Sequence, residues 1–210
     1  MSKPLIIIGA GDHAKVLLDI LLEQGEKVIG LSDKTVPKGT LIYGVPVIGD
    51  DDVVLSCKTD EIELVNGIGS VNSTALREKI FNRFKNKGYI FKTIVHKSAV
   101  ISGRAELSEG AQILAGTVIT TETKIGENTI INTRTSIDHG CVIGNHCHIA
   151  PGCVLSGCVK VGDETHIGTG SSVIQGISIG EKVLIGAGSV VVKDIPDCAK
   201  AFGVPAKIRK

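Results

Sequence analysis

The chain contains no tryptophan and few aromatic residues of any kind. Its 210 residues include only two tyrosines, four phenylalanines and one methionine, while 42% are hydrophobic. A core of useful size is therefore expected, and it has to be built from aliphatic side chains. The chain also lacks a basic run, and its formal net charge is +1. We therefore expect neither nucleic acid nor an anionic membrane as a partner.

A long apolar stretch is also missing near the N-terminus. Residues 5–8 are apolar, but no basic region precedes them and the run is short. It is too short for a signal peptide or a membrane-spanning helix. We expect a cytoplasmic location.

The six cysteines include no Cys-x-x-Cys pair. Cys141, Cys147 and Cys153 are six residues apart and share one position of the repeat described below, which places them on successive faces of a coil. They should not meet one another. We expect the cysteines to be buried free thiols that pack as small apolar residues, without a disulfide or a metal.

The second half of the chain has a strict repeat of six. Every sixth residue from Val95 to Val191 is valine, isoleucine or leucine. Six is a multiple of the strand period of two and does not fit the helical period of 3.6. Each hexad can therefore be a short strand followed by a turn, and stacked hexads give a parallel β-helix. Three hexads would form one triangular coil, so residues 18 apart should stack.

A second position of the repeat supports this interpretation. Four residues after each aliphatic residue the side chain is usually small or β-branched, which suits a tight corner: Ala99, Ala105, Ala111, Thr117, Thr123, Thr129, Thr135, Cys141, Cys147 and Cys153. Glycine also follows many of the aliphatic residues and permits backbone angles that other residues avoid.

The first 90 residues have a different pattern. Residues 5–8 suit a strand buried on both faces, 27–31 a second strand and 61–68 a third. Helical spacing follows the first strand up to Gly25 and returns over 72–87, where Ala75, Leu76, Ile80 and Phe84 would share a face. We therefore expect an α/β, Rossmann-like β-α-β domain over residues 1–90 and an all-β parallel β-helix over 91–210.

A glycine-rich turn joins the first strand to the first helix. Its Gly9-x-Gly11-x-x-Ala14 pattern lets the backbone approach a phosphate at the helix N-terminus, and Asp33 after the second strand could hold a ribose hydroxyl. A tight turn without a ligand would give the same pattern. The domain is short for a full dinucleotide, so a mononucleotide or a nucleotide sugar fits better than NAD.

Six histidines are candidates for chemistry. His139 follows the buried Ile137 by two residues, and a neutral imidazole there could act as a general base or be an ordinary surface residue. His148 and His166 are 18 apart and should stack, which leaves a zinc site open, as in β-helical carbonic anhydrases. A third ligand is not evident, so no metal is expected.

The glycine-rich turn, the uninterrupted hexads and the tail over residues 202–207 (Phe-Gly-Val-Pro-Ala-Lys) together resemble one family. It is the hexapeptide-repeat acetyltransferases of bacterial sugars, which act on nucleotide-linked amino sugars or on sialic acids. The resemblance implies a left-handed β-helix, acetyl-CoA as co-substrate and a homotrimer. It implies N-acetylation of a nucleotide-linked 4-amino-4,6-dideoxy sugar for a bacterial surface glycan, with O-acetylation of a sialic acid as the alternative.

The same resemblance implies roles for individual residues. His139 matches the catalytic base, Asn132 a residue near the sugar, and His148 a residue close to the acetyl thioester. Either backbone N–H groups of the coil or His148 could then stabilise the oxyanion. Further positions match the coenzyme A side of the site: Gly157, Thr169, Gly186 and Ala187. Others match the nucleotide-sugar side: Gly11, Asp12, His13, Ser32, Asp33 and Gly69.

One departure from the family affects the proposed base. Members often carry Glu or Asp directly after the catalytic histidine, where this chain has Gly140. Asp138 on the other side is one candidate substitute, and a carboxylate of a neighbouring subunit is another. Without either, His139 would work with no acidic partner. A protein that kept the fold and lost catalysis, as a scaffold or a metal-binding β-helix, therefore stays open.

Overall fold

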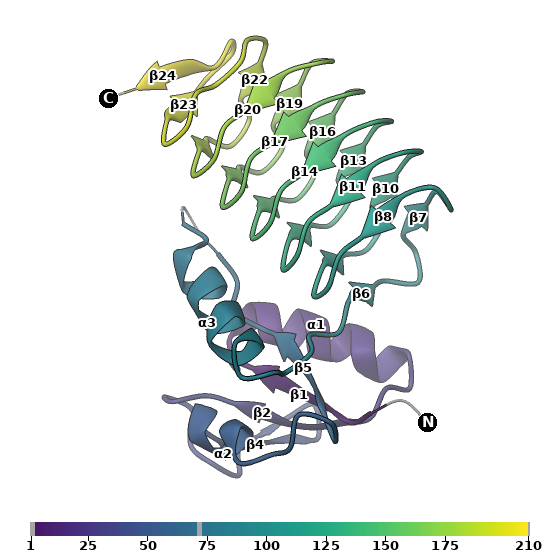
Figure 1. Cartoon of the computed structure of the whole chain (residues 1–210), viewed down its shortest axis with the longest axis vertical. Coiled ribbons are helices and arrows are strands. Elements are labelled where there is room, and N and C mark those ends of the chain that lie inside the picture. The colour runs from purple at the N-terminus through teal and green to yellow at the C-terminus, as the bar shows by residue number, and fades with distance from the viewer. Residues whose placement is uncertain (1–2, 71–72, 210) are drawn as a thin grey trace. The chain divides into compact units, whose positions relative to one another are not determined.

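The computed structural model describes residues 3–70 and 73–209, which form two compact units. One contains the chain up to Gly69 together with Lys79–Lys92, and the other contains Ser70–Glu78 and the chain from Thr93 onward. Each unit is described by itself below, and both are drawn in Figure 1.

The first unit is a five-stranded sheet with helices on both faces. The strand order is β3-β4-β2-β1-β5, parallel except for the β3–β4 hairpin. Its elements are β1 (Leu5–Ile8), α1 (Asp12–Glu23), β2 (Val28–Ser32), β3 (Leu41–Ile42), β4 (Val45–Gly49), α2 (Asp51–Leu55), β5 (Glu63–Asn66) and α3 (Ala75–Lys85). The three predicted strands and two predicted helices are present. The prediction was wrong to omit β3, β4 and α2 between them.

Side-chain alternation in β1 explains why both faces of this sheet are covered. Ile6 and Ile8 pack with Val54 of α2 and with Phe81 and Phe84 of α3. Ile7 points the other way, toward the side where Ala14 of α1 packs, and a Cβ on Gly67 would meet both residues at 2.7 Å.

The helical face predicted for α3 was partly wrong. Leu76 is 60% exposed and Ala75 is exposed, whereas Arg77, Phe81 and Phe84 are buried. The predicted start at Asn72 lies outside the described residues.

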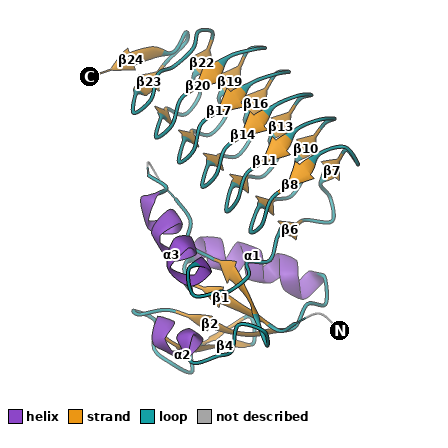
Figure 2. Cartoon of the chain, viewed as in Figure 1, coloured by secondary structure: helices purple, strands orange, loops and turns teal. Residues whose placement is uncertain are grey.

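The second unit is the expected left-handed β-helix, with three parallel sheets wound from two-residue strands (Figure 2). The eight-stranded sheet contains β6 (Ile94–Val95), β9 (Gln112–Ile113), β12 (Ile130–Ile131), β15 (His148–Ile149), β18 (His166–Ile167), β21 (Leu184–Ile185), β23 (Lys200–Phe202) and the antiparallel β24 (Lys207–Arg209).

The other two sheets complete each coil. One contains β7 (Val100–Ile101), β10 (Val118–Ile119), β13 (Ser136–Ile137), β16 (Val154–Leu155), β19 (Ser172–Val173) and β22 (Val190–Val191). The other contains β8 (Glu106–Leu107), β11 (Lys124–Ile125), β14 (Val142–Ile143), β17 (Lys160–Val161) and β20 (Ser178–Ile179). Register partners such as Ile131 and Ile149 are 18 residues apart, which confirms the triangular coil.

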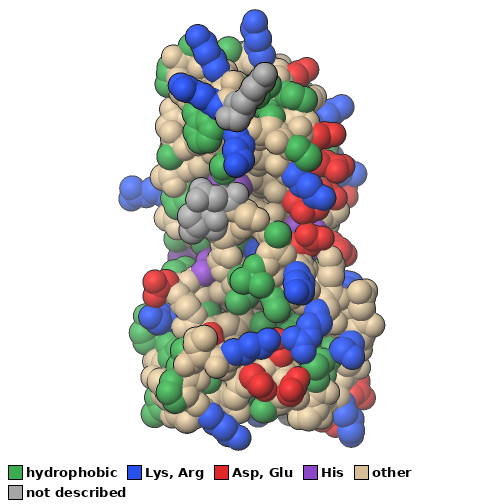
Figure 3. Space-filling view, turned by 90° about the vertical axis from the view of Figure 1, so that its left-hand side faces the viewer, with side chains coloured by type: hydrophobic (Ala, Val, Ile, Leu, Met, Phe, Trp, Pro, Cys, Tyr) green, Lys and Arg blue, Asp and Glu red, His purple; other side chains and the backbone are tan. Residues whose placement is uncertain are grey.

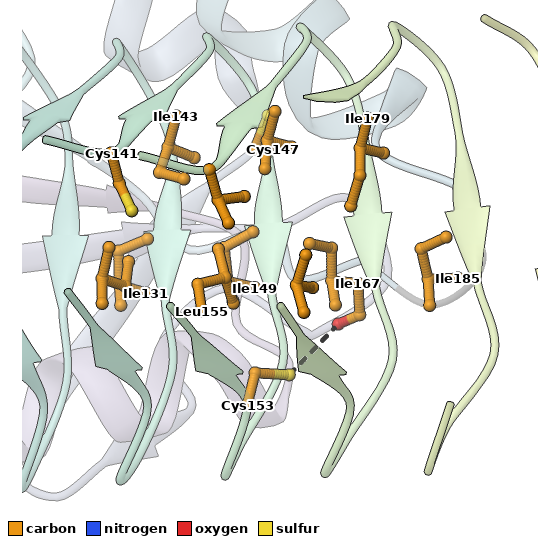
Figure 4. Close-up of a cluster of buried hydrophobic side chains, with 14 of the residues drawn as sticks. Ile131, Cys141, Ile143, Cys147, Ile149, Cys153, Leu155, Ile167, Ile179 and Ile185 are labelled. Atoms are coloured by element: carbon orange, nitrogen blue, oxygen red, sulfur yellow. Dashed lines mark hydrogen bonds between the residues drawn. The ribbon is translucent and has the colours of Figure 1, made fainter. Parts of the chain in front are cut away.

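The aliphatic residue of each hexad and the small residue four positions after it both point into the solenoid (Figure 4). We call these two sets the aliphatic column and the small column. The small column also forms hydrogen bonds. Its hydroxyls and thiols donate to the carbonyl 15 residues later, one coil on, at 2.7–3.3 Å: Thr117, Thr123, Thr129, Thr135, Cys141, Cys147, Cys153, Thr165 and Ser171. Buried carbonyls at the corners are thereby satisfied.

The cysteine prediction holds for three of the six residues. Cys141, Cys147 and Cys153 are buried free thiols, and burial raises their pKa values to about 11, 12 and 11, so each remains a protonated donor. Cys57 is a free thiol that is only half-buried. Cys158 and Cys198 are exposed, so the prediction of burial was wrong for them, because both occupy turns with positive φ at the surface.

On the face that Figure 3 shows, acidic side chains gather along one side of the solenoid with lysines among them. Ion pairs between stacked residues, such as Lys124–Glu106 at 3.1 Å and Lys182–Glu164 at 3.4 Å, interleave the two signs. In the described part of the chain, the helices are all too short or too polar to cross a membrane.

Candidate active site

His139 lies exposed in the turn after β13, directly over Gly157 of the next coil. A Cβ on Gly157 would stand 2.5 Å from both Cε1 and Nε2 of the imidazole, so only glycine leaves room for this ring. The φ of Gly157 is not in the left-handed region, so space alone explains the glycine. Cys158 N donates to His139 O at 2.8 Å, which fixes the two coils together. The Gly157–His139 stacking predicted from the 18-residue period is confirmed.

Asp138 holds the turn that carries His139. Its Oδ1 accepts from the backbone N–H of His139 at 2.8 Å and from Thr120 Oγ1 at 3.1 Å. These bonds, the backbone one first, hold the pKa of Asp138 below its usual value. The carboxylate is thus ionised beside the imidazole, and the hydrogen bonds seen here attach it to the backbone and to Thr120.

Gly140 stands where family members often carry an acidic residue. Its φ is +65°, and an added Cβ would lie 3.3 Å from Sγ of Cys158, so a side chain here would need a small shift of that thiol. The backbone alone does not exclude one, because Glu122 and Glu164 adopt the same positive φ at the equivalent turn position. Cys158 occupies the space beside Gly140, and sequence spacing had not singled it out.

His148 of β15 is buried, with both ring nitrogens engaged. Nδ1 lies 2.7 Å from Ser70 Oγ and 3.1 Å from Ser70 O, and Nε2 lies 3.0 Å from Asn132 Nδ2. The structure thus brings together Asn132 and His148, both expected in the site, and adds Ser70, which the sequence did not reveal. Nε2 therefore faces the Asn132 amide nitrogen, and the tautomer of the ring decides which of the two atoms donates.

His166 stacks on His148 as predicted, edge to face, with ring centroids 4.9 Å apart. Among the described residues its buried Nδ1 has no hydrogen-bond partner, and burial lowers the pKa of His166. Within residues 3–70 and 73–209, no three His, Cys, Asp or Glu side chains come close enough together to hold a metal.

The positions expected near coenzyme A lie on successive coils. Thr169 and Ala187 are exposed in stacked turns, and Gly188 N donates to Thr169 O at 2.8 Å. Gly186 differs from them, because the ring of Phe202 occupies the space that a side chain would need. At Gly157 the corresponding space is occupied by the ring of His139.

In the first unit, loops follow β1, β2 and β5 at the same edge of the parallel sheet, where α/β sheets bind ligands. Gly9 has a φ of +93°, and Gly11 is the N-cap of α1, with open space where its side chain would be. Gly69 packs on His13, with 3.1 Å from an added Cβ to the His13 Cβ. The exposed Asp12 pairs with Lys15 at 2.9 Å.

Asp33 and Ser32 differ in what they can offer a ligand. The Asp33 carboxylate accepts from Ala10 N at 2.9 Å, Thr35 N at 2.8 Å and Val36 N at 3.1 Å, and also from the Thr35 hydroxyl. Partial burial alone would raise the pKa of Asp33, but these hydrogen bonds outweigh it and lower the pKa. Asp33 therefore organises the loop. Ser32 Oγ is buried and has no hydrogen-bond partner in the part of the chain that the structure describes, so it can donate to a ligand.

Family comparisons match both halves of the chain. Residues 4–84 match the PglD N-terminal domain, 122–157 the bacterial transferase hexapeptide (six repeats) and 158–193 the hexapeptide repeat of succinyl-transferase. Comparison with curated protein sequences gives no match at the significance threshold.

Solved structures match over nearly the full length. A variant of perosamine N-acetyltransferase from Caulobacter crescentus, in complex with CoA and GDP-perosamine, is 37% identical, with a TM-score of 0.92 and coverage of 99% of this chain and 97% of that one. The acetyltransferase domain of PglB from Neisseria gonorrhoeae, in complex with acetyl coenzyme A, is 30% identical, with a TM-score of 0.92 and full coverage of both chains. WeeI from Acinetobacter baumannii is 26% identical, with a TM-score of 0.89 and coverage of 99% and 100%.

Fold and sequence therefore define an acyltransferase of the hexapeptide-repeat class. The chain belongs to the family of two-domain sugar acetyltransferases that join a PglD-type N-terminal domain to a left-handed β-helix, as the sequence resemblance predicted.

Proposed function

We propose that the protein transfers the acetyl group of acetyl-CoA to the amine of a nucleotide-linked 4-amino-4,6-dideoxy sugar, with His139 as general base. One observation carries the proposal: the exposed imidazole of His139 lies directly against Gly157, where a Cβ would stand 2.5 Å from both Cε1 and Nε2. The acceptor class follows from the perosamine N-acetyltransferase, which was solved with CoA and GDP-perosamine.

The reaction is a direct transfer. The sugar nitrogen attacks the thioester carbonyl carbon while His139 accepts a proton from that nitrogen. The resulting oxyanion collapses, the carbon–sulfur bond breaks, and the coenzyme A thiolate recovers the proton from the imidazolium. In the described part of the chain the Gly157 N–H donates to no protein acceptor and adjoins the His139 ring, so it is the donor we assign to the oxyanion.

The remaining assignments follow from this reaction. The loops with Gly11, Asp12, His13, Ser32, Asp33 and Gly69 would hold the nucleotide, and the turns with Thr169, Gly186 and Ala187 would meet coenzyme A. We propose a homotrimer by analogy with the family, because a β-helix with flat sheet faces suits packing side by side. A cytoplasmic role in surface-glycan synthesis would supply both co-substrates.

The test is release of coenzyme A thiol with a panel of acceptors. The panel contains GDP-, UDP- and dTDP-linked 4-amino sugars, CMP-linked sialic acid and free sialic acid. Turnover of an amino sugar supports the proposal and names the nucleotide, whereas turnover of a sialic acid alone would make the protein an O-acetyltransferase. No turnover of any acceptor, together with no binding of acetyl-CoA, would indicate a scaffold protein.

The role of His139 has a test of its own. His139→Ala should lower turnover by about two to four decades and leave acetyl-CoA affinity nearly unchanged. His96→Ala is the matched control, because His96 belongs to the same solenoid and its Nδ1 bonds Ser98. Turnover within a few-fold of wild type in both variants would remove His139 from the mechanism.

A further inference from the structure

The side-chain amide of Asn132 has one possible orientation. Its Oδ1 accepts from the backbone N–H of Thr133 at 2.8 Å and from Thr133 Oγ1 at 3.3 Å. A backbone N–H can only donate, so the amide oxygen has to face it. The NH₂ group therefore faces Nε2 of His148, 3.0 Å away.

This orientation determines where the proton of His148 lies. An NH₂ group donates, so Nε2 presents its lone pair and Nδ1 carries the hydrogen. That hydrogen faces Ser70 O at 3.1 Å and Ser70 Oγ at 2.7 Å, both of which can accept. A proton on Nε2 would instead point at the amide hydrogens of Asn132 and repel them. Because only 8% of His148 is exposed, water has little access to relieve that repulsion.

From this geometry we infer that Ser70, His148 and Asn132 form a positioning relay. His148 stays neutral, holds one N–H of Asn132, and so directs the second N–H of that amide toward the acceptor sugar. The inference rests on the proposed function, because it gives Asn132 a sugar to bind. It changes the role expected for His148, which transfers no proton and meets no oxyanion. Ser70, directly after Gly69 in the sequence, becomes a positioning residue.

The tautomer can be measured without any substrate. Nitrogen-15 NMR of histidine-labelled protein distinguishes Nδ1–H, Nε2–H and the charged ring, and a His148→Gln variant assigns the signal. We expect Nδ1–H for His148 in the wild-type protein at pH 8. In Asn132→Asp a carboxylate oxygen replaces the NH₂ group, so the His148 signal should move to a form protonated on Nε2.

Kinetics then test what the relay positions. Asn132→Asp should lower kcat/KM for the amino sugar by about ten- to a hundredfold, and Ser70→Ala by about two- to tenfold because the Ser70 carbonyl still accepts. KM for acetyl-CoA should stay within about twofold in both variants if the relay serves the sugar alone. Ser73→Ala is the matched control, since it deletes a hydroxyl of the same segment that accepts only from Ala75 N.

Two results would overturn the relay. A wild-type His148 that carries its proton on Nε2, or that is charged at neutral pH, contradicts the geometry whatever the activity. An Asn132→Asp variant that raises KM for acetyl-CoA and leaves the sugar unaffected contradicts the role given to Asn132. Because the tautomer is read without substrates, failure of the proposed function would show separately, as wild-type protein that acetylates no sugar in the panel.

Discussion

Gly157→Ala is the most direct test of the site, because the three atoms nearest the new methyl all belong to the proposed base. The added Cβ would lie 2.5 Å from Cε1 and Nε2 of His139, whereas ordinary carbon contacts are about 3.5 Å or longer. The imidazole therefore has to move by about 1 Å, and a displacement of that size at a reacting group costs about a hundredfold in rate. The backbone of Gly157 is one that alanine can adopt, so the fold should survive.

The assay compares kcat, acetyl-CoA affinity and the thermal midpoint of Gly157→Ala with those of Gly103→Ala. Gly103 is the matched control, because a Cβ there would meet nothing within 4 Å and its φ is also outside the left-handed region. We expect a kcat about a hundredfold lower for Gly157→Ala alone, with both variants melting near wild type. A kcat within about threefold of wild type in a folded Gly157→Ala variant would refute the reasoning, because the ring would then be displaced without consequence.

Three further predictions concern individual side chains. Cys147→Ala removes the donor to Gly162 O at 3.1 Å and should lower the free energy of unfolding in urea by about 1–3 kcal/mol at fixed protein concentration. Cys147→Ser keeps a donor and should lose less. Equal losses in both variants would contradict a stabilising role for the hydrogen bonds of the small column. Asp138→Asn keeps the acceptor for His139 N–H but removes a negative charge, so the acidic limb of the kcat/KM profile should move to lower pH, and an unchanged profile would remove Asp138 from the mechanism. Burial lowers the pKa of His166 below its ordinary value of 6.5. As the pH falls, the histidine of the unfolded chain therefore takes up a proton before that of the folded chain. The free energy of unfolding should fall below about pH 6.5, by at most about 1.4 kcal/mol per pH unit. His166→Leu should flatten that slope in urea unfolding between pH 7 and 5, and an unaltered slope would count against the assignment.

The solenoid could be predicted from the sequence because one residue in six determines its register. Shifting the pairing by one residue would turn every aliphatic side chain outward, so the column of Val, Ile and Leu permits one arrangement. The chemistry of the small column was not visible in the same way. Threonine, cysteine and alanine look alike as small residues, and only the 15-residue offset seen in space explains why most of them carry a hydrogen-bond donor.

The omitted part of the first unit shows how turn residues conceal a strand. Residues 37–46 contain Pro37, Gly39, Gly44 and Pro46, which argue for a loop. Yet β4 starts at Val45 and pairs with β2, where Leu31 lies opposite Val47. Gly30 assists this pairing, because the side chain of Ile48 occupies the space that a larger residue would need. Tertiary packing of this kind cannot be read from local preferences.

The two histidines show which part of the site periodicity could reveal. The six-residue repeat places His139 in a turn over residue 157, and both positions are visible in the sequence. The same repeat places His148 at an outward position of its strand, together with Gln112 and Ile130, which are buried. The matching outward position elsewhere carries Lys124 and Lys160, which are exposed.

The burial of this outward column shows that the face is covered, but residue type does not predict it, because outward valines such as Val118 and Val142 on the other faces are exposed. The sequence also does not say what covers the face: Ser70 is 78 residues from His148 in sequence and contacts it only through the fold. Roles that depend on a turn of the solenoid can therefore be assigned from spacing. Roles that depend on what covers a sheet, such as the protonation state of His148, require coordinates.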